Sequence, residues 1–298
     1  MSAAEPAAVG GRLFVVATPI GNLGDVTLRA LEVLAAVPLV AAEDTRHTLR
    51  LFARHGLATR LVSYHARNAA TRGPELLAHL RCGADLGLVT DAGTPLVSDP
   101  GGALVAAWAA EGGAVVPIPG PSAVLAGLVA SGIAGPRWAF EGFLPRSGRE
   151  RRTRLALVGD DSRTTVLFEA PGRVAATLAD LAAACGADRP AAVCRELTKI
   201  HEEVRRGSLA DLAAAAAAGA IVARGEVVIV IGDRGAGSPR RAPAADSGGI
   251  EEEEALARAR ADVERLVADG AARGDAARRV AVATGIPRRR LYGARGAG

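Results

Sequence analysis

The sequence predicts an α/β protein in which two α/β domains are followed by a short helical tail. The chain has 298 residues, which suits two domains of roughly 150 residues each. Short apolar runs alternate with helical patterns up to residue 132, as in βα units that build a mostly parallel sheet with helices on both faces. A segment rich in Pro, Gly and Arg at 135–150 interrupts the alternation, a second set of strands and helices follows, and the pattern from Glu251 onward is helical. We expect domains at residues 12–136 and 137–233, a linker at 234–250 and a basic helical tail at 251–298.

In the first domain, five apolar runs predict strands, and each run is followed by a helical pattern. The helix after the first strand places Leu28, Leu31 and Leu34 on one face, behind Thr27 as an N-terminal cap. The expected strands are residues 12–17, 38–43, 61–65, 85–90 and 114–119. The expected helices are residues 27–36, a helix that starts near Thr45, and residues 74–82, 102–112 and 122–132.

The second domain repeats the alternation with fewer elements, and the tail carries the basic excess. Strands are expected at 164–169, 191–196 and 226–232, and helices from Arg173 and at 208–218. Residues 232–249 have the Gly, Pro and Ser content of a linker. Residues 254–298 hold ten Arg against five acidic residues, a local net charge of +5, whereas the whole chain carries +4. The tail is therefore a candidate for docking to RNA. Alternatively, it packs as part of the fold or contributes to a dimer interface.

Composition and missing motifs exclude several classes of protein. No apolar run reaches the roughly 18 residues that a membrane span needs, and the first residues, MSAAEPAAVGGR, lack the basic and apolar parts of a secretory signal. The three cysteines form neither a CxxC pair nor an even set, so we expect unpaired thiols in a cytoplasmic protein without structural zinc. The motifs GxGxxG, HExxH and GxSxG are absent, the single lysine is far from any Gly-rich turn, and the histidines lack metal-ligand spacing. These observations exclude NAD-type Rossmann enzymes, P-loop nucleotidases, zinc peptidases and α/β-hydrolases.

The bias in basic residues singles out Lys199. Of the 36 basic residues, 35 are Arg and one is Lys. Arg replaces Lys as a charge but not as a compact amine that can lose its proton. A lysine that persists in such a composition is a candidate functional residue, with chance survival as the alternative.

Four loops follow strands of the first domain, at the edge where open α/β sheets bind ligands. They are residues 17–25, 42–48, 90–102 and 117–123. Their Gly and Pro residues allow backbone N–H and C=O groups to approach a ligand closely. The two loops richest in Pro and Gly contain no Lys or Arg, whereas a polyphosphate would need one. Together the loops indicate a site for a neutral or cationic ligand, although tight turns alone would explain any one of them.

Several motifs carry a resemblance to a known family. They are LFVVATPIGNLGDVTLRALEVL, AAEDTRHT, LVTDAGTPLVSDPG, PIPGPSA, FEGFLPR, CRELTK and GEVVIVI, in order from about Leu13 to Gly232. In these segments the chain resembles the bacterial ribosomal RNA small-subunit methyltransferase I family, part of the tetrapyrrole-methylase-like S-adenosylmethionine enzymes. The resemblance implies two α/β domains of tetrapyrrole-methylase type with the cofactor cleft between them. It also implies that a homodimer uses S-adenosylmethionine to methylate the 2′-hydroxyl of a cytidine, cytidine 1402, in the decoding centre of 16S rRNA on the small ribosomal subunit.

The resemblance also implies which residues contact the cofactor. They lie in the loops after the first, fourth and fifth strands and, in the second domain, at a strand end and a turn. These residues are Pro19, Ile20, Gly93, Thr94, Leu96, Val97, Ser122, Ala123, Phe168, Glu169 and Gly225. Carbonyls, small residues and apolar walls suit the sulfonium and the adenine of S-adenosylmethionine.

Methyl transfer to a ribose hydroxyl requires alignment of the reacting oxygen and is helped by a general base. The candidate catalytic residues are Asp44, Glu196 and Lys199, with Glu169 as a further carboxylate. For the first two, the alternative is an ion pair with Arg46 or Arg195. Lys199 either holds the hydroxyl or a phosphate, or loses its proton beside Arg195 and acts as the base.

Arginines are the candidate RNA contacts, since they would hold phosphates without reading sequence. These residues are Arg46, Arg146, Arg149, Arg151 and Arg152. Only nine residues of the chain are aromatic, which favours recognition of RNA shape over stacking of single-stranded bases.

Two other functions stay open at the level of sequence. One is a tetrapyrrole methyltransferase on the same fold, acting on a precorrin or uroporphyrinogen. The other is a non-catalytic ribosome-assembly factor that only binds RNA. Transfer of labelled methyl groups to small subunits rather than to uroporphyrinogen would distinguish an rRNA methyltransferase from a tetrapyrrole methyltransferase. Absence of S-adenosylmethionine binding would favour the non-catalytic factor.

Overall fold

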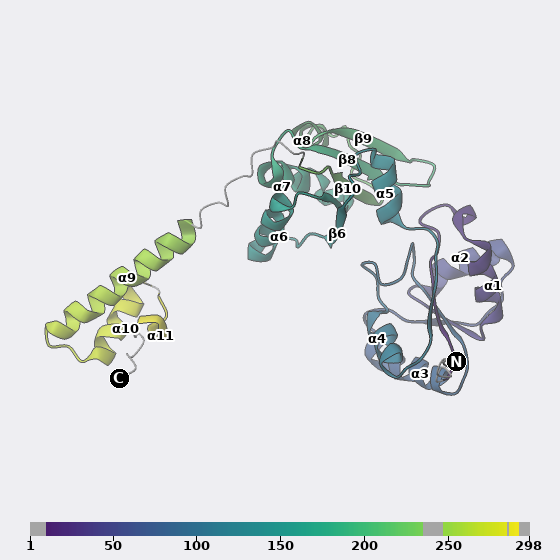
Figure 1. Ribbon diagram of the computed structural model, residues 1–298, viewed down its shortest axis with the longest axis horizontal. Helices are drawn as coiled ribbons and strands as arrows, with labels where there is room; N and C mark the ends of the chain where they lie inside the picture. Colours follow the sequence, from purple (N-terminus) through teal and green to yellow (C-terminus); the bar gives the residue numbers. More distant parts are fainter. Residues whose placement is uncertain (1–9, 235–246, 285, 292–298) are drawn as a thin grey trace, which may run out of the picture. The chain divides into compact units, whose positions relative to one another are not determined.

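The computed structural model describes residues 10–234, 247–284 and 286–291, which form two compact units (Figure 1). The first unit holds two five-stranded sheets, and the second holds the helices of the tail. All three cysteines lie in the first unit and are free, as the sequence predicts. Within the described ranges, no helix combines the length and the hydropathy that a membrane span requires.

The first sheet is parallel throughout, as the alternation of strands and helices predicts. Its strands are β1 (Leu13–Val16), β2 (Leu39–Ala42), β3 (Leu61–Ser63), β4 (Leu86–Val89) and β5 (Val115–Ile118). They lie in the order β3-β2-β4-β1-β5, so Leu13 pairs with Leu86 on one side and with Val115 on the other. Because the strands are parallel, the loops after β2, β4, β1 and β5 meet at one edge of the sheet.

Helices cover both faces of this sheet, because alternate residues of each strand point to opposite faces. On one face, α3 (Ala69–Arg81) and α4 (Gly102–Ala110) pack around the fully buried Trp108. On the other face, α1 (Leu28–Ala36) and α2 (Thr45–His55) contribute Leu34 and Phe52 to a separate core cluster. The short helix η1 (Leu23–Asp25) lies in the loop after β1.

The cap of α1 is confirmed, but its predicted buried face is partly wrong. The Thr27 hydroxyl accepts a hydrogen bond of 3.1 Å from the backbone N–H of Ala30. Ala30 and Leu34 are buried, whereas Leu28 is 79% exposed. Residues 30 and 34 are one turn apart and share a face, while residue 28 lies about 200° away from residue 30 around the helix.

The second sheet is mixed. Its strands are β6 (Trp138–Phe143), β7 (Thr164–Glu169), β8 (Pro190–Arg195), β9 (Glu203–Ser208) and β10 (Val227–Ile231). In the order β6-β7-β10-β8-β9, only β6 and β7 run parallel, and the other neighbours are antiparallel. One face is covered by α6 (Gly148–Asp160), α7 (Val174–Cys185) and α8 (Leu209–Ala217), with the short helix η2 (Pro171–Arg173) before α7.

The opposite face of the second sheet is covered by α5 (Ala123–Ser131), which follows β5 in the chain. Val124 and Leu128 of α5 lie in one buried cluster with Val228 of β10. At Gly127 the helix approaches so closely that a Cβ there would collide with Val228. The expected boundary at residue 136 therefore assigns α5 to a sheet on which it does not pack.

The tail forms the second unit, with a core of its own. Its helices are α9 (Ser247–Ala268), α10 (Arg273–Thr284) and α11 (Arg288–Leu291). Ala259, Val263, Ala276, Val280 and Leu291 are buried together. The predicted helical character from Glu251 onward is confirmed over the described residues, and most of the expected linker lies outside them.

Candidate functional site

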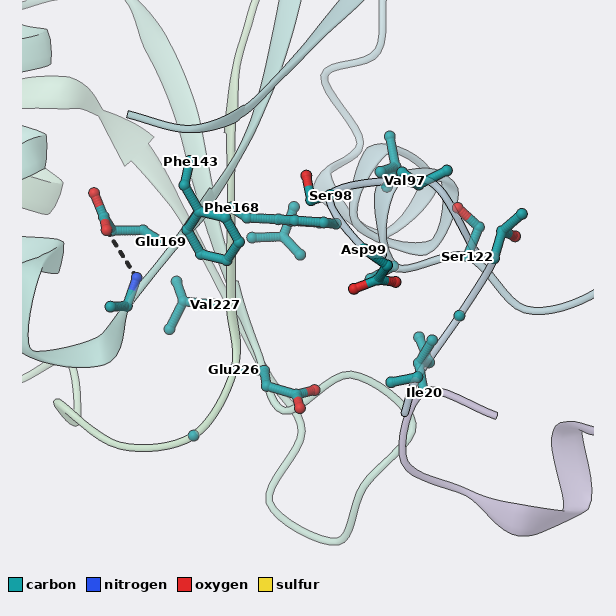
Figure 2. A pocket seen from close by; sticks show the side chains of 18 of the residues that line it. Ile20, Val97, Ser98, Asp99, Ser122, Phe143, Phe168, Glu169, Glu226 and Val227 are labelled. Atoms are coloured by element: carbon teal, nitrogen blue, oxygen red, sulfur yellow. Dashed lines mark hydrogen bonds between the residues drawn. The ribbon is translucent and has the colours of Figure 1, made fainter. Parts of the chain in front are cut away.

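A cavity of about 360 Å³ lies between the carboxyl edge of the first sheet and one end of the second (Figure 2). Its volume falls in the range of pockets for small ligands, roughly 300–1,000 Å³. Loops after β1, β4 and β5 form one wall, and β6, β7 and β10 form the other. The lining residues are Ile20, 92–94, 97–99, 122–124, Phe143, 168–171 and 225–228.

Hydrogen bonds fix three of the sequence-predicted loops to one another. Thr18 and Gly93 exchange two backbone hydrogen bonds of 2.9 Å, which join the loops after β1 and β4. The Thr18 hydroxyl also donates to the carbonyl of Thr90 at 3.0 Å. The Thr94 hydroxyl donates to the carbonyl of Pro121 at 3.3 Å, which joins the loops after β4 and β5.

The loop after β4 reaches its shape through left-handed backbone conformations. Leu96 and Ser98 have φ angles of 76° and 68°, in a region that favours glycine. Gly93 and Gly101 in the same loop have φ angles of 83° and 122°. Strained non-glycine residues of this kind are concentrated at ligand sites.

The second sheet contributes an aromatic wall. The rings of Phe143 and Phe168 are tilted against each other with centroids 5.6 Å apart, and Phe140 supports Phe168 at 4.8 Å. Gly225 has a φ angle of 82°, and a Cβ at this position would collide with the carboxyl group of Glu196. This end of the cavity is therefore apolar and suits a flat ring.

The electrostatic character of the cavity comes from Asp99 and Glu226, whose carboxylates face it (Figure 2). Among the described residues that line the cavity, none is Lys, Arg or His. Burial raises the pKa of Asp99 to about 6, with a further contribution from the nearby carboxylates of Glu43 and Asp91. At neutral pH the Asp99 carboxyl group is mostly ionised, so the cavity favours a cationic ligand.

Glu169 lines the cavity, but its carboxylate is engaged in the fold. It accepts hydrogen bonds from the Ala170 N–H at 2.8 Å and from the Thr177 hydroxyl at 2.6 Å (Figure 2 shows the first). Its third partner is Arg173, whose Nε lies 3.2 Å away. With these three partners, the Glu169 carboxylate is not placed to take a proton from a substrate.

Lys199 is a hydrogen-bond donor to two carboxylates. Its Nζ lies 2.8 Å from Oε1 of Glu196 and 3.1 Å from Oε2 of Glu226. Burial alone would lower the pKa of Lys199, but these hydrogen bonds raise it above its ordinary value. The hypothesis that Lys199 loses its proton near neutral pH is therefore wrong. Its expected neighbour Arg195 pairs instead with Glu203, at 3.2 Å.

Glu196 and Asp44 are also held in ion pairs outside the cavity lining. The hydrogen bond from Lys199 holds the pKa of Glu196 below its usual range. Asp44 caps α2, and its carboxylate binds Arg46 through Nε at 3.0 Å and Nη2 at 2.5 Å, which holds its pKa well below the usual range. Both carboxylates are therefore weak proton acceptors near neutral pH.

Of the arginines considered for RNA contacts, Arg151 is structural. Its side chain is only 9% exposed and donates to Asp180 at 2.8 Å, to the Thr177 hydroxyl at 3.0 Å and to the Pro145 carbonyl at 2.9 Å. The expectation that it contacts a phosphate is wrong, because the guanidinium is used to join α6 to α7. The other four candidates are exposed: Arg46, Arg146, Arg149 and Arg152.

Most residues that the resemblance assigns to the cofactor line this cavity. They are Ile20, Gly93, Thr94, Val97, Ser122, Ala123, Phe168, Glu169 and Gly225. Two do not: Pro19 lines a neighbouring cavity, and Leu96 packs towards Gly101. Sequence reasoning missed Asp99 and Glu226, although the first lies in a loop that it selected and the second follows Gly225.

Solved structures of methyltransferases share this fold. Cobalt precorrin-4 methyltransferase CbiF aligns with a TM-score of 0.59 over 77% of this chain and 98% of that chain, at 19% identity. Uroporphyrin-III C-methyltransferase from Thermus thermophilus, complexed with S-adenosyl homocysteine, aligns with a TM-score of 0.54 over 74% of this chain and 97% of that chain, at 21% identity. At these identities the likeness concerns the fold.

Sequence relatives define the class more narrowly. The family model described as tetrapyrrole (corrin/porphyrin) methylases matches residues 12–213. Ribosomal RNA small subunit methyltransferase I from Synechocystis sp. is 43% identical over 95% of this chain and 96% of its own length. The protein of the same name from Micromonospora olivasterospora is 46% identical over 95% of this chain and 85% of its own length. The chain therefore belongs to the tetrapyrrole methylase family and, within it, to the ribosomal RNA small subunit methyltransferase I family.

Proposed function

We propose that this chain is an enzyme that transfers a methyl group from S-adenosylmethionine to the 2′-hydroxyl of a cytidine, cytidine 1402, in the decoding centre of 16S rRNA. The observation that carries the proposal is the cavity between the sheets, with the carboxylates of Asp99 and Glu226 facing it, an aromatic wall and no basic side chain among its described lining residues. The names of the curated relatives support small-subunit rRNA as the substrate. The sequence motifs support the finer assignment to a ribose hydroxyl.

The lining residues fit S-adenosylmethionine group by group. Asp99 and Glu226 suit the sulfonium cation, and Phe143 and Phe168 suit the adenine. The N-terminus of α5, at Ala123, provides backbone N–H groups for a carboxylate. When bound, S-adenosylmethionine supplies an electrophilic methyl group. The protein has to hold the hydroxyl oxygen in line with that group and take up its proton.

We assign the uptake of the proton to Asp99. A carboxylate with a pKa of about 6 is ionised at neutral pH and is a stronger proton acceptor than an ordinary aspartate. Lys199 and Glu196 act instead as positioning residues, because together they hold Glu226 at the edge of the cavity. Asp44 fixes the start of α2 and the side chain of Arg46.

The exposed arginines provide the RNA contacts of this proposal. Arg46 lies on α2, beside the carboxyl edge of the first sheet, and its side chain is 85% exposed. Arg146, Arg149 and Arg152 lie at the start of α6 or just before it and are also exposed. Such side chains bind phosphates and orient the RNA. We also propose that the enzyme acts as a homodimer in the cytoplasm. This part of the proposal rests on the sequence resemblance.

A transfer assay tests the proposed function. Purified protein is incubated with methyl-labelled S-adenosylmethionine and, separately, with small ribosomal subunits that lack the modification or with uroporphyrinogen III. The proposal predicts label in 16S rRNA and none in the tetrapyrrole. Label in the tetrapyrrole alone would contradict it, and calorimetric binding of S-adenosylmethionine without any transfer would favour a factor that only binds RNA.

A further inference from the structure

The loop between β8 and β9, residues 196–202, presents a fully exposed isoleucine. Ile200 is 98% exposed, the largest exposed fraction among the large apolar side chains of the described residues. Three positions earlier, Leu197 is only 8% exposed and lies in one buried cluster with Val228 of β10. One exposed apolar side chain is ordinary on a protein surface, so its significance depends on how the loop is held and what surrounds it.

Hydrogen bonds hold this loop in one conformation. Glu196 and Thr198 have φ angles of 52° and 67°, in the left-handed region that favours glycine. The Thr198 N–H donates to Oε2 of Glu202 at 2.6 Å. The Lys199 N–H donates to the Glu196 carbonyl at 3.0 Å, and its Nζ donates to the Glu196 carboxylate at 2.8 Å. Because the loop is fixed at these points, Ile200 is held in solvent and loses little conformational freedom when a partner covers it.

The tip of this loop forms one lip of a groove of about 530 Å³. The other lip is formed by residues 21–23, in the loop after β1. Leu23 is 37% exposed, and its carbonyl lies 3.1 Å from Nε2 of His55, which ties this lip to the end of α2. Each lip therefore has an exposed apolar side chain and is fixed to the fold by hydrogen bonds.

The surface beside this groove carries a row of arginines. Arg46, Arg50 and Arg54 follow one another at four-residue intervals on α2, so neighbours lie about 40° apart around the helix and about 6 Å apart along it. All three are exposed, and within the described residues Arg50 and Arg54 have no ion-pair partner. Leu23 and Lys199 line both this groove and the cavity that Arg50 lines, so the row adjoins the groove. Unpaired cations in a row suit the phosphates of a nucleic-acid strand better than an apolar protein surface.

We propose that Ile200 is a wedge that enters the base stack of the rRNA strand next to the target nucleotide, while Arg50 and Arg54 hold phosphates of the same strand. Proteins that bend or open nucleic acids frequently insert apolar side chains, isoleucine among them, between base steps. Unstacking costs free energy, and burial of a rigidly presented isoleucine offsets part of that cost. This inference rests on the proposed function, because it assigns the contact that opens the same RNA substrate.

Three variants at exposed positions test the wedge in the full-length protein. Ile200→Ser removes the apolar side chain and Ile200→Leu keeps it. The matched control is Val129→Ser, because Val129 of α5 is 79% exposed and does not line the groove. The substrate is small ribosomal subunits from cells that lack the gene. We expect kcat/KM for methyl transfer to fall at least tenfold with Ile200→Ser and to stay within about threefold with the other two, with unchanged affinity for S-adenosylmethionine.

A second readout does not depend on catalysis. Acylation of ribose 2′-hydroxyls, which reports unstacked nucleotides, is mapped on the same subunits in the presence of S-adenosylhomocysteine and each variant. Wild type and Ile200→Leu should raise the reactivity of a nucleotide beside the target, and Ile200→Ser should not. In filter binding, Arg54→Ser should make the dependence of affinity on salt shallower, whereas Ile200→Ser should leave that slope unchanged because it removes no charge.

Wild-type kcat/KM for Ile200→Ser, or the reactivity pattern of wild type with this variant, would overturn the inference. A smaller molecular mass of Ile200→Ser in solution would also overturn it, because the side chain would then contact a second copy of the chain. An unchanged salt slope with Arg54→Ser would overturn the assignment of the phosphates. If the reactivity of the rRNA changes through Ile200 but wild type transfers no methyl group to it, the proposed function alone is contradicted.

Discussion

At the scale of single residues, Asp99 is the side chain on which the proposed chemistry depends. Its carboxylate lines the cavity that we propose for the cofactor, and burial together with Glu43 and Asp91 raises its pKa to about 6. The rate of methyl transfer should therefore rise with pH through about 6 and then level off. Asp99→Asn should lower the plateau rate by roughly 10²-fold or more, the range for loss of a general base. A variant with a wild-type rate at pH 8 would show that the proton leaves by another route.

The same residue has a predicted effect on stability. Because its pKa is higher in the folded protein than in the unfolded chain, the protonated acid favours folding, and this contribution is lost as pH rises through about 6. Asp99→Asn should therefore raise the melting temperature relative to wild type at pH 8, with the difference vanishing near pH 4. Thermal melts across this range measure it. Asp160→Asn, at an exposed position at the end of α6, is the control and should shift neither melt.

Lys199→Arg tests whether this residue is more than a charge. Lys199 donates to Glu196 and Glu226, and its aliphatic stem packs where a Cβ at Gly21 would lie. A planar guanidinium cannot take this place without displacing the loop, so we expect at least a tenfold loss of methyl-transfer rate, about 1.4 kcal/mol.

Because Lys199 keeps its proton, that loss should be constant between pH 6 and 9. A loss that grows or shrinks with pH would restore the base hypothesis. If the Lys199→Arg variant turns over within twofold of wild type, position 199 requires only a positive charge.

The sequence selected Lys199 and the loop that contains Asp99, but it did not predict the protonation of either residue. The composition selected Lys199, but its protonation depends on Glu226, which lies 27 positions away, just before β10. Asp99 lies inside a selected loop, yet its raised pKa comes from burial and from Glu43, at the end of another strand. Properties that depend on such non-local contacts cannot be predicted from spacing along the chain.

At the scale of elements, the loops after β4 and β5 carry the prediction about the cofactor. Thr94 and Ser122 both line the cavity, and an arginine at either position would place a long cation in a space that favours a cationic ligand. Thr94→Arg and Ser122→Arg should each abolish S-adenosylmethionine binding in calorimetry and leave the far-UV circular dichroism spectrum unchanged. Thr71→Arg, on an exposed position of α3, should bind as wild type does. Wild-type affinity in both cavity variants would refute this placement of the cofactor.

The strands of the first sheet could be predicted almost completely, because they are short, mostly apolar runs, and the three central strands are buried. The second sheet could not. The edge strand β9 contains Glu203, Arg205 and Arg206, which hide it from a search for apolar runs. The strand β6 contains Gly142 with a φ angle of 63°, at an irregularity in its pairing with β7. The packing of α5 on the far sheet is a tertiary contact that no local pattern encodes.

At the scale of the whole molecule, the tail is a separate unit with its own core. Deletion of residues 239–298 should therefore leave the first unit folded, with unchanged affinity for S-adenosylmethionine. Since the tail carries a basic excess, the truncated protein should bind small subunits more weakly and with a shallower dependence on salt. Filter binding at several salt concentrations measures both quantities. An unchanged salt slope would assign the tail to dimerisation or folding instead.

We propose that this chain methylates the ribose of one cytidine in 16S rRNA. Mapping of 2′-O-methylation at single-nucleotide resolution, in rRNA from cells that contain or lack the gene, tests it most directly. We expect that one ribose methylation in the decoding centre, at cytidine 1402, disappears with the gene and returns with the wild-type gene but not with Thr94→Arg. An identical ribose-methylation map in both strains would contradict it, as would the loss of a methyl group from a base in place of a ribose.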